Sequence, residues 1–164
     1  MLFQLISRIK FLLSSTNQHG VHSPFVFDFV TKGLYKKSIN TNEIDKYLEL
    51  NSLSKKKKKI LSKIITYFNV NEFYFSNKSQ ISTLNNEFKL LYFRNLNEEE
   101  IVNSILLNEN TILIFHHIYK NNKSLKLWNN FLKKQSNIVS IDLYYFSLLF
   151  YRPQQAKEHF KIRV

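Results

Sequence analysis

The spacing of apolar residues predicts helices in the first seventy residues of the chain. Residues 2–13 carry their apolar side chains largely on one helical face, which indicates an amphipathic helix. Pro24 suits the first position of a second helix, expected to continue to about Leu34. A third apolar stripe ends at Phe68 and follows the run Lys55 to Lys59, which we interpret as the solvated first turns of that helix.

From residue 71 onward, apolar runs of strand length replace the helical stripes, with helical patterns between the earlier runs. Strands that alternate with helices predict a parallel α/β sheet, and two late runs separated by a few residues predict an antiparallel hairpin. The expected strands are Glu72–Ser76, Glu87–Phe93, Thr111–Phe115, Ile138–Asp142 and Phe146–Tyr151, with a sixth at His159–Val164; the expected helices between them open at Asn97 and Ser124.

The chain shows neither an internal repeat nor a Gly/Ser-rich linker. We therefore expect one compact unit, with a helical region over residues 1–70 followed by a shortened α/β domain over residues 71–164.

The amino-acid composition excludes several classes of fold and functional site. The absence of cysteine excludes a disulfide scaffold, a thiolate zinc site and a cysteine nucleophile. The chain contains two glycines, Gly20 and Gly33. Glycine lets a backbone approach a phosphate or cofactor closely, so the chain has few positions suited to such an approach. No run reaches the roughly 18 apolar residues of a membrane span. The first residues lack a signal-peptide cleavage site, so we expect a cytoplasmic protein.

The net charge of +12 makes nucleic acid or an anionic membrane a reasonable partner class. Lysine supplies 20 of the 24 cations, in a sequence also rich in Asn, Ile, Phe and Tyr, as AT-rich codons would produce. This composition favours the interpretation that the lysines cover a solvated surface over the interpretation that they bind a specific nucleic acid. Nonspecific nucleic-acid binding stays an alternative. The helix over residues 2–13 has two interpretations, a membrane-surface helix or, more commonly, a helix docked on the core of its own domain.

Two stretches resemble a known family. The segment from His19 to Asp28, HGVHSPFVFD, is similar to the N-terminal signature of a group of bacterial class I S-adenosylmethionine-dependent methyltransferases. The segments from Ile141 to Arg152 and from Lys157 to Arg163 resemble the end of the same group. The resemblance implies a Rossmann-like methyltransferase sheet, a cofactor loop after its first strand and methyl transfer from the sulfonium.

The residues that would hold the cofactor depart from the family pattern. Tyr74 stands where the family has an acid, and Ser76 and Gln80 stand at its two loop glycines. Gln80 would place a long side chain where the nucleoside rests. The short distance to the next strand implies loss of the second and third family strands, which leaves Glu72–Ser76 at or near an edge of the sheet.

A second family site is altered as well. The family has two acids after the strand that corresponds to Thr111–Phe115, where related enzymes bind a metal or substrate, and this chain has His116 and His117. Adjacent residues that leave a strand are expected to point to opposite sides, so these two histidines are weak metal ligands and no metal is expected.

His19, His22 and Asp28 form the remaining polar group in the sequence. They would either line a pocket or tie the N-terminal helices to the sheet by hydrogen bonds, and the second interpretation is favoured because no nucleophile or convergent acid accompanies them.

These observations predict a shortened methyltransferase-like protein that has lost S-adenosylmethionine binding and catalysis, and that acts as a binding or regulatory protein. We therefore expect no catalytic residue and no cofactor. The alternatives are an active methyltransferase with an atypical pocket, which would use S-adenosylmethionine, and a basic nucleic-acid-binding protein. An exposed sheet edge would also allow a homodimer.

Overall fold

The computed structural model describes residues 2–37, 42–75, 88–96 and 108–164. The chain divides into two compact units. The sheet unit consists of Met1–Ser15 and Asn71–Arg163, and the helical unit consists of Thr16–Val70 with Val164. One division falls at the predicted boundary near residue 70. The first fifteen residues group with the sheet and not with the predicted helical region, because Phe11 is buried in the core of the sheet unit.

The helical unit contains short helices before one long helix. The elements are η1 (Gln18–Gly20), α2 (Pro24–Asp28), the π-helical η2 (Phe29–Leu34), α3 (Asn42–Asp45), η3 (Leu48–Leu50) and α4 (Lys55–Phe68). The predicted helix from Pro24 to Leu34 is present as α2 continued by η2. The predicted end at Phe68 is confirmed, and Asn69 stops α4 with a left-handed backbone (φ 47°).

Aromatic side chains pack the helical unit where α2 and η2 meet α4. The ring of Phe29 lies 5.0 Å from that of Phe68 and 5.2 Å from that of Tyr67, measured between centroids. Gly33 allows this approach, because a Cβ on Gly33 would lie 2.9 Å from Cγ of Tyr67 and 3.1 Å from Cδ2 of Phe29. The scarce glycine therefore serves helix packing and not a positive φ.

Gly33→Ala is expected to lower the free energy of unfolding by about 1–2 kcal/mol, because the clash with two packed rings outweighs the helix propensity of alanine. The measurement is the midpoint of urea unfolding. Lys32→Ala on the same helical segment is the control, since it removes only an exposed pair with Asp28 and should leave the unfolding midpoint almost unchanged. A Gly33→Ala protein as stable as the native one would refute this packing account.

Among its described residues, the sheet unit contains six strands in the order β1-β2-β3-β5-β4-β6. Their bounds are β1 (Glu72–Phe75), β2 (Lys89–Phe93), β3 (Thr111–His116), β4 (Ile138–Asp142), β5 (Phe146–Tyr151) and β6 (Glu158–Lys161). Neighbouring pairs are parallel at β1–β2, β2–β3 and β4–β6, and antiparallel at β3–β5 and β4–β5. The predicted closing hairpin is confirmed as β4–β5, and β1 lies at an edge, as predicted.

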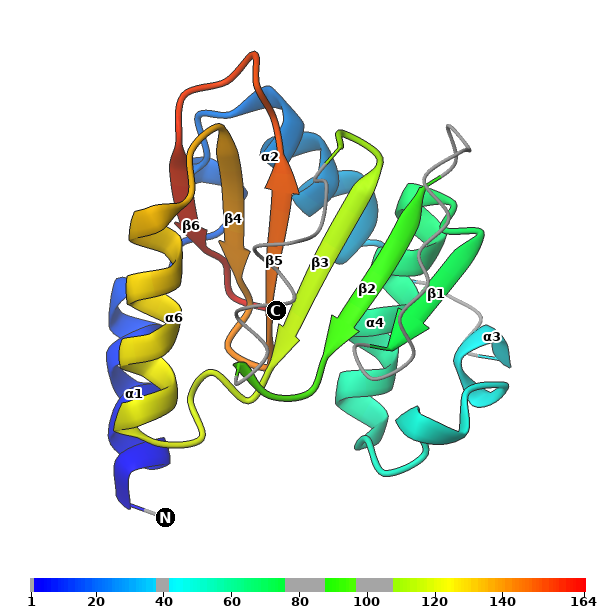
Figure 1. The fold of residues 1–164 in the computed structure, drawn as a ribbon, viewed down its shortest axis with the longest axis horizontal. Coiled ribbons are helices and arrows are strands. Elements are labelled where there is room, and N and C mark those ends of the chain that lie inside the picture. The colour runs from blue at the N-terminus through cyan, green and yellow to red at the C-terminus, as the bar shows by residue number, and fades with distance from the viewer. Residues whose placement is uncertain (1, 38–41, 76–87, 97–107) are drawn as a thin grey trace. The chain divides into compact units, whose positions relative to one another are not determined.

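Two helices, α1 (Leu2–Ser14) and α6 (Asn122–Lys134), belong to the sheet unit and lie beside each other at one side of it (Figure 1). α6 begins two residues before the predicted Ser124, because the side chain of Asn121 caps it by accepting a hydrogen bond from the Ser124 N–H. The predicted helix that opens at Asn97 lies outside the described residues.

Alternate residues of the central strands face α1 and α6 and form the core of the unit with them. The pairs Leu91–Leu113 and Phe93–Phe115 are opposite each other in the β2–β3 register. The core also contains Phe11, Trp128, Phe131, Ile138 and Leu149, all buried.

The observed architecture is an α/β fold with a six-stranded, mixed, Rossmann-like sheet. It confirms the predicted fold class. Among the described helices, none combines the length and the apolar character that crossing a membrane requires.

Candidate functional site

The carboxyl ends of β1, β2, β3 and β4 lie at the same edge of the sheet, because these four strands run in one direction. In open α/β sheets, ligands bind outside this edge, in the crevice where the strand order reverses. Here β1, β2 and β3 follow one another in the sheet with no reversal among them.

The polar side chains at this edge are the candidate site. We call them the carboxyl-edge cluster, which consists of Tyr92, His116, His117, Tyr119, Asp142, Tyr144 and Ser147. The sheet separates the cluster into two parts, because Asp142 and Ser147 are paired on the face with α1 and α6, whereas Tyr92 and His116 occupy alternate positions that face the other way.

Asp142 ends β4 and is buried with its carboxylate fully engaged within the chain. Oδ1 accepts hydrogen bonds from the Tyr144 N–H at 2.8 Å and from Ser147 Oγ at 3.3 Å. Oδ2 accepts a short hydrogen bond from the Tyr119 hydroxyl. The rings of Tyr119 and Tyr144 stack on each other with centroids 4.8 Å apart. Asp142 thus joins the loops that follow β3 and β4.

Burial raises the pKa of Asp142 to about 6, and it outweighs the hydrogen bonds from Tyr119, Tyr144 and Ser147 and the charge of Lys161, which act in the opposite direction. Burial also raises the pKa of Tyr119. A carboxyl with a pKa near neutrality resembles a general acid or base. Asp142, however, is only 1% exposed. Its proton is therefore shared with other groups of the protein and not with a substrate.

On the opposite face, Tyr92 Oη and His116 Nδ1 share a hydrogen bond of 2.7 Å, and both side chains are buried. The Phe146 ring lies 5.1 Å from the His116 ring. Burial raises the pKa of Tyr92 above its ordinary value. The pair joins the ends of β2 and β3 and has the character of a buried structural hydrogen bond.

His116 and His117 do not point to opposite sides, contrary to the prediction from strand alternation. Their rings stack, with centroids 3.6 Å apart and an interplanar angle of 21°. The reason is that β3 ends at His116 and the backbone of His117 turns into the left-handed region (φ 65°), which breaks the alternation.

Within residues 2–37, 42–75, 88–96 and 108–164, no three His, Asp or Glu side chains gather closely enough to hold a metal ion. The stacked histidines provide two imidazoles in a geometry that places ring against ring and does not converge the nitrogens on one point.

Tyr74 lies near the end of β1 and points to the core face. Its ring packs against the core of the sheet unit, and its hydroxyl donates a hydrogen bond to Glu72 Oε2 at 2.5 Å. Glu72 also lies 3.4 Å from Nζ of the buried Lys89 in the neighbouring strand. Tyr74 is therefore an aromatic residue of the core with an internal hydrogen-bond partner. Ser76 and Gln80, the other two residues compared with the family's cofactor loop, lie outside the described residues.

His19, His22 and Asp28 contact different neighbours. The His19 ring is 3.3 Å from Gln18 Nε2, and Asp28 accepts a 2.7 Å bond from Lys32 one turn later in the helix. His22 is exposed. The partners of His19 and Asp28 are thus close to them in the sequence.

A separate cavity of about 540 Å³ lies within the helical unit. Four lysines of α4 line it, Lys55, Lys56, Lys59 and Lys63, together with Leu34, Tyr35, Ile60 and Val164. Burial and the charge of Lys59 lower the pKa of Lys63, whose ammonium donates to the carbonyl of Leu34. Lys58, on another side of α4, pairs with Asp45 at 2.7 Å. At least one lysine of the run Lys55 to Lys59 therefore forms an ion pair within the helical unit.

The sequence did not single out Asp142, Tyr119 or Tyr92. A signal for Asp142 exists in retrospect, since a lone carboxylate ends an apolar strand there. Pairing between Tyr92 and His116 depends on the β2–β3 register, which only the folded sheet supplies.

Comparisons of this chain with models of protein families, with curated protein sequences and with solved structures find no match.

Proposed function

We propose that this chain is a shortened methyltransferase-like protein that neither binds S-adenosylmethionine nor transfers a methyl group, and that works as a binding or regulatory protein. The observation that supports this most strongly is the position of β1 at the edge of the sheet, followed without reversal by β2 and β3. A nucleoside-binding crevice needs a strand on each side of the point where the strand order reverses. Among the described strands, β1 has a neighbour on one side, β2.

The side chains at the carboxyl edge support the same proposal. The hydrogen-bonding groups of Asp142, Tyr119 and His116 are buried and bonded to other residues of the chain, so they hold loops together. Tyr74 places an aromatic ring at the position where the family pattern has an acid. The residues described at this edge do not fit S-adenosylmethionine, and no catalytic step is assigned to them.

The test is the shift of the thermal unfolding midpoint in millimolar S-adenosylmethionine or S-adenosylhomocysteine. A ligand at 100 times its Kd would stabilise the protein by about 2.7 kcal/mol, which for a chain of this size is a shift of several degrees. We expect no resolvable shift, with an active methyltransferase measured in parallel to verify the ligand stocks. A dose-dependent upward shift would instead favour the alternative of a working enzyme with an atypical pocket.

Three finer expectations remain part of this proposal. The edge position of β1 is compatible with pairing to a second copy, although Glu72 and the buried Lys89 place charges beside that edge. Nonspecific attraction of nucleic acid to the lysines of α4 would weaken steeply with salt and would show no sequence preference. A cytoplasmic location agrees with the absence of cysteine from the sequence.

A further inference from the structure

Helix α1 exposes its more apolar side to solvent, whereas a helix docked on a protein core normally buries that side. The residues that it buries are Ser7 and Phe11. Its more apolar side is exposed, with side chains between 43% and 82% accessible, and consists of Leu2, Leu5, Ile6, Ile9, Leu12 and Leu13. The more common of the two interpretations from the sequence, a helix whose apolar stripe covers its own core, does not describe this surface. We call these six residues the α1 apolar face.

The α1 apolar face is continuous and bordered by cations. At about 100° per residue, its six members fall within an arc of about 120°, directed away from the arc that holds Ser7 and Phe11. Arg8 lies at one border of this arc and Lys10 at the other, and both are exposed. Exposed contiguous apolar surface of this kind marks an interaction site in a folded protein.

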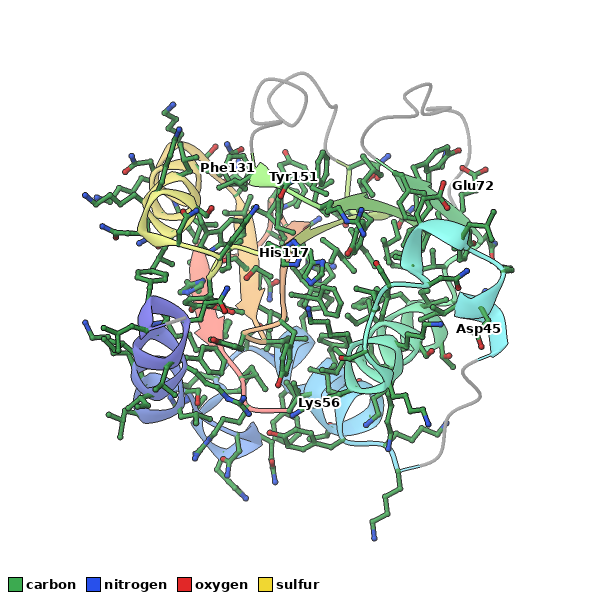
Figure 2. All side chains as sticks on the ribbon, turned by 90° about the horizontal axis from the view of Figure 1, so that it is seen from below. Asp45, Lys56, Glu72, His117, Phe131 and Tyr151 are labelled. Atoms are coloured by element: carbon green, nitrogen blue, oxygen red, sulfur yellow. The ribbon has the colours of Figure 1, made fainter. Side chains whose placement is uncertain are left out.

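The charge around the face indicates which partner it fits. α1 contains no acidic residue. The neighbouring α6, which lies beside α1 in both views (Figures 1 and 2), exposes Lys123, Lys126, Lys133 and Lys134 and also contains no acidic residue. The whole chain carries a net charge of +12. A partner that complements an apolar face with cationic borders has an apolar layer, which takes up the face, beneath an anionic layer, which attracts the cations.

A second copy of the chain is a poorer complement. Pairing two α1 apolar faces would bring Arg8 and Lys10 of each copy to the rim of the same contact, with no carboxylate in either α1 to offset them. Nucleic acid would complement the cations but would leave the six apolar side chains in water.

We propose that α1 lies in the plane of an anionic lipid bilayer surface, with its apolar face in the acyl boundary and Arg8 and Lys10 reaching the headgroup phosphates. The proposal rests on the proposed function in taking the chain as a binding protein, and it names what the chain binds. S-adenosylmethionine binding is measured without lipid, so either proposal can fail while the other stands.

The experiment is cosedimentation of the full chain with vesicles of phosphatidylcholine alone and of phosphatidylcholine with about 30% phosphatidylglycerol. We expect binding to the anionic vesicles that weakens with salt, and little binding to the neutral ones. The variant Arg8→Gln/Lys10→Gln should bind the anionic vesicles at least tenfold more weakly.

A matched pair of leucines separates insertion of the face from attraction of a basic protein to an anionic surface. Leu13 in α1 is 82% exposed and Leu48 in the helical unit is 80% exposed. Leu13→Gln should weaken vesicle binding roughly five- to tenfold, whereas Leu48→Gln, with the same change in polarity and the same net charge, should leave it unchanged. Leu5→Gln/Ile9→Gln should weaken it further. Circular dichroism verifies that each variant stays folded.

Three results would overturn the proposal. One is a wild-type chain that does not sediment with anionic vesicles at low salt. Another is equal binding by Leu13→Gln and Leu48→Gln, which would reduce the attraction to net charge. The last is a dimer in light scattering without lipid that Leu5→Gln/Ile9→Gln converts to a monomer, with no vesicle binding, since the face would then belong to a second copy.

Discussion

Trp128→Ala is expected to lower the free energy of unfolding by about 3–5 kcal/mol, the largest effect of a single substitution that we anticipate in the sheet unit. Trp128 is fully buried where α6 meets the sheet. Its ring lies 5.1 Å from that of Phe115 in β3 and 5.9 Å from that of Phe131 in α6, between centroids. Alanine would leave a cavity that these packed rings cannot close.

Trp128→Phe is the matched control for this cavity. Among the described residues, the indole Nε1 of Trp128 is buried without a hydrogen-bond partner. Phenylalanine removes that unsatisfied donor while it keeps most of the aromatic contact, so the loss should be about 1 kcal/mol. Urea unfolding of both variants gives the comparison. Equal losses for Ala and Phe would mean that the packing between α6 and β3 contributes little.

Asp142→Asn is expected to stabilise the protein relative to the native chain by about 2 kcal/mol above pH 7, because the native chain must then bury a charge. The folded pKa of Asp142, about 6, lies above its ordinary value of 3.8. The folded state therefore binds the proton more tightly than the unfolded state. This contribution to stability is complete below about pH 4 and is lost as the pH rises to about 6.

Asparagine keeps the oxygen that accepts from Tyr144 and Ser147, and its amide can donate to the Tyr119 hydroxyl, without a charge to bury. The measurement is the difference in unfolding free energy between variant and native chains from pH 4 to pH 8, in which the titration of other groups cancels. The difference should grow with pH. A flat difference would mean that Asp142 titrates at its ordinary pKa.

Asp142→Ala is the control for the hydrogen bonds. It removes the charge but leaves the Tyr144 N–H and the Tyr119 hydroxyl without their acceptor in a buried site. It should destabilise the protein by about 1–3 kcal/mol at pH 4 and by less at pH 8, because only the native chain loses the stability that comes from the raised pKa of Asp142. A stabilising Asp142→Ala at pH 4 would indicate that the hydrogen bonds of Asp142 contribute little to the stability of this site.

The sequence pattern predicted the fold well where periodicity is strong. The bounds of β4 and β5 match the predicted Ile138–Asp142 and Phe146–Tyr151, and α4 matches the run from Lys55 to Phe68. Prediction succeeded here because strand-length apolar runs and helical stripes are local properties of the chain. The bounds of β6 are shifted, since Glu158 pairs with Val139 while the last residues leave the sheet.

The candidate site was less predictable, because its geometry depends on contacts between distant residues. Strand alternation placed His116 and His117 apart, and one left-handed residue brought their rings together. The apolar stripe of α1 was visible in the sequence, but the side that it turns to solvent depends on how Phe11 docks in the core. Periodicity reveals that a helix has two sides and does not reveal which one is covered.

We propose that the carboxyl edge of this sheet does not bind a nucleoside. Equilibrium dialysis of concentrated protein against radiolabelled S-adenosylmethionine tests it most directly, because it detects bound ligand without relying on a change in stability. We expect equal concentrations of label on both sides of the membrane at every protein concentration. A saturable excess of label on the protein side, displaced by S-adenosylhomocysteine, would contradict the account.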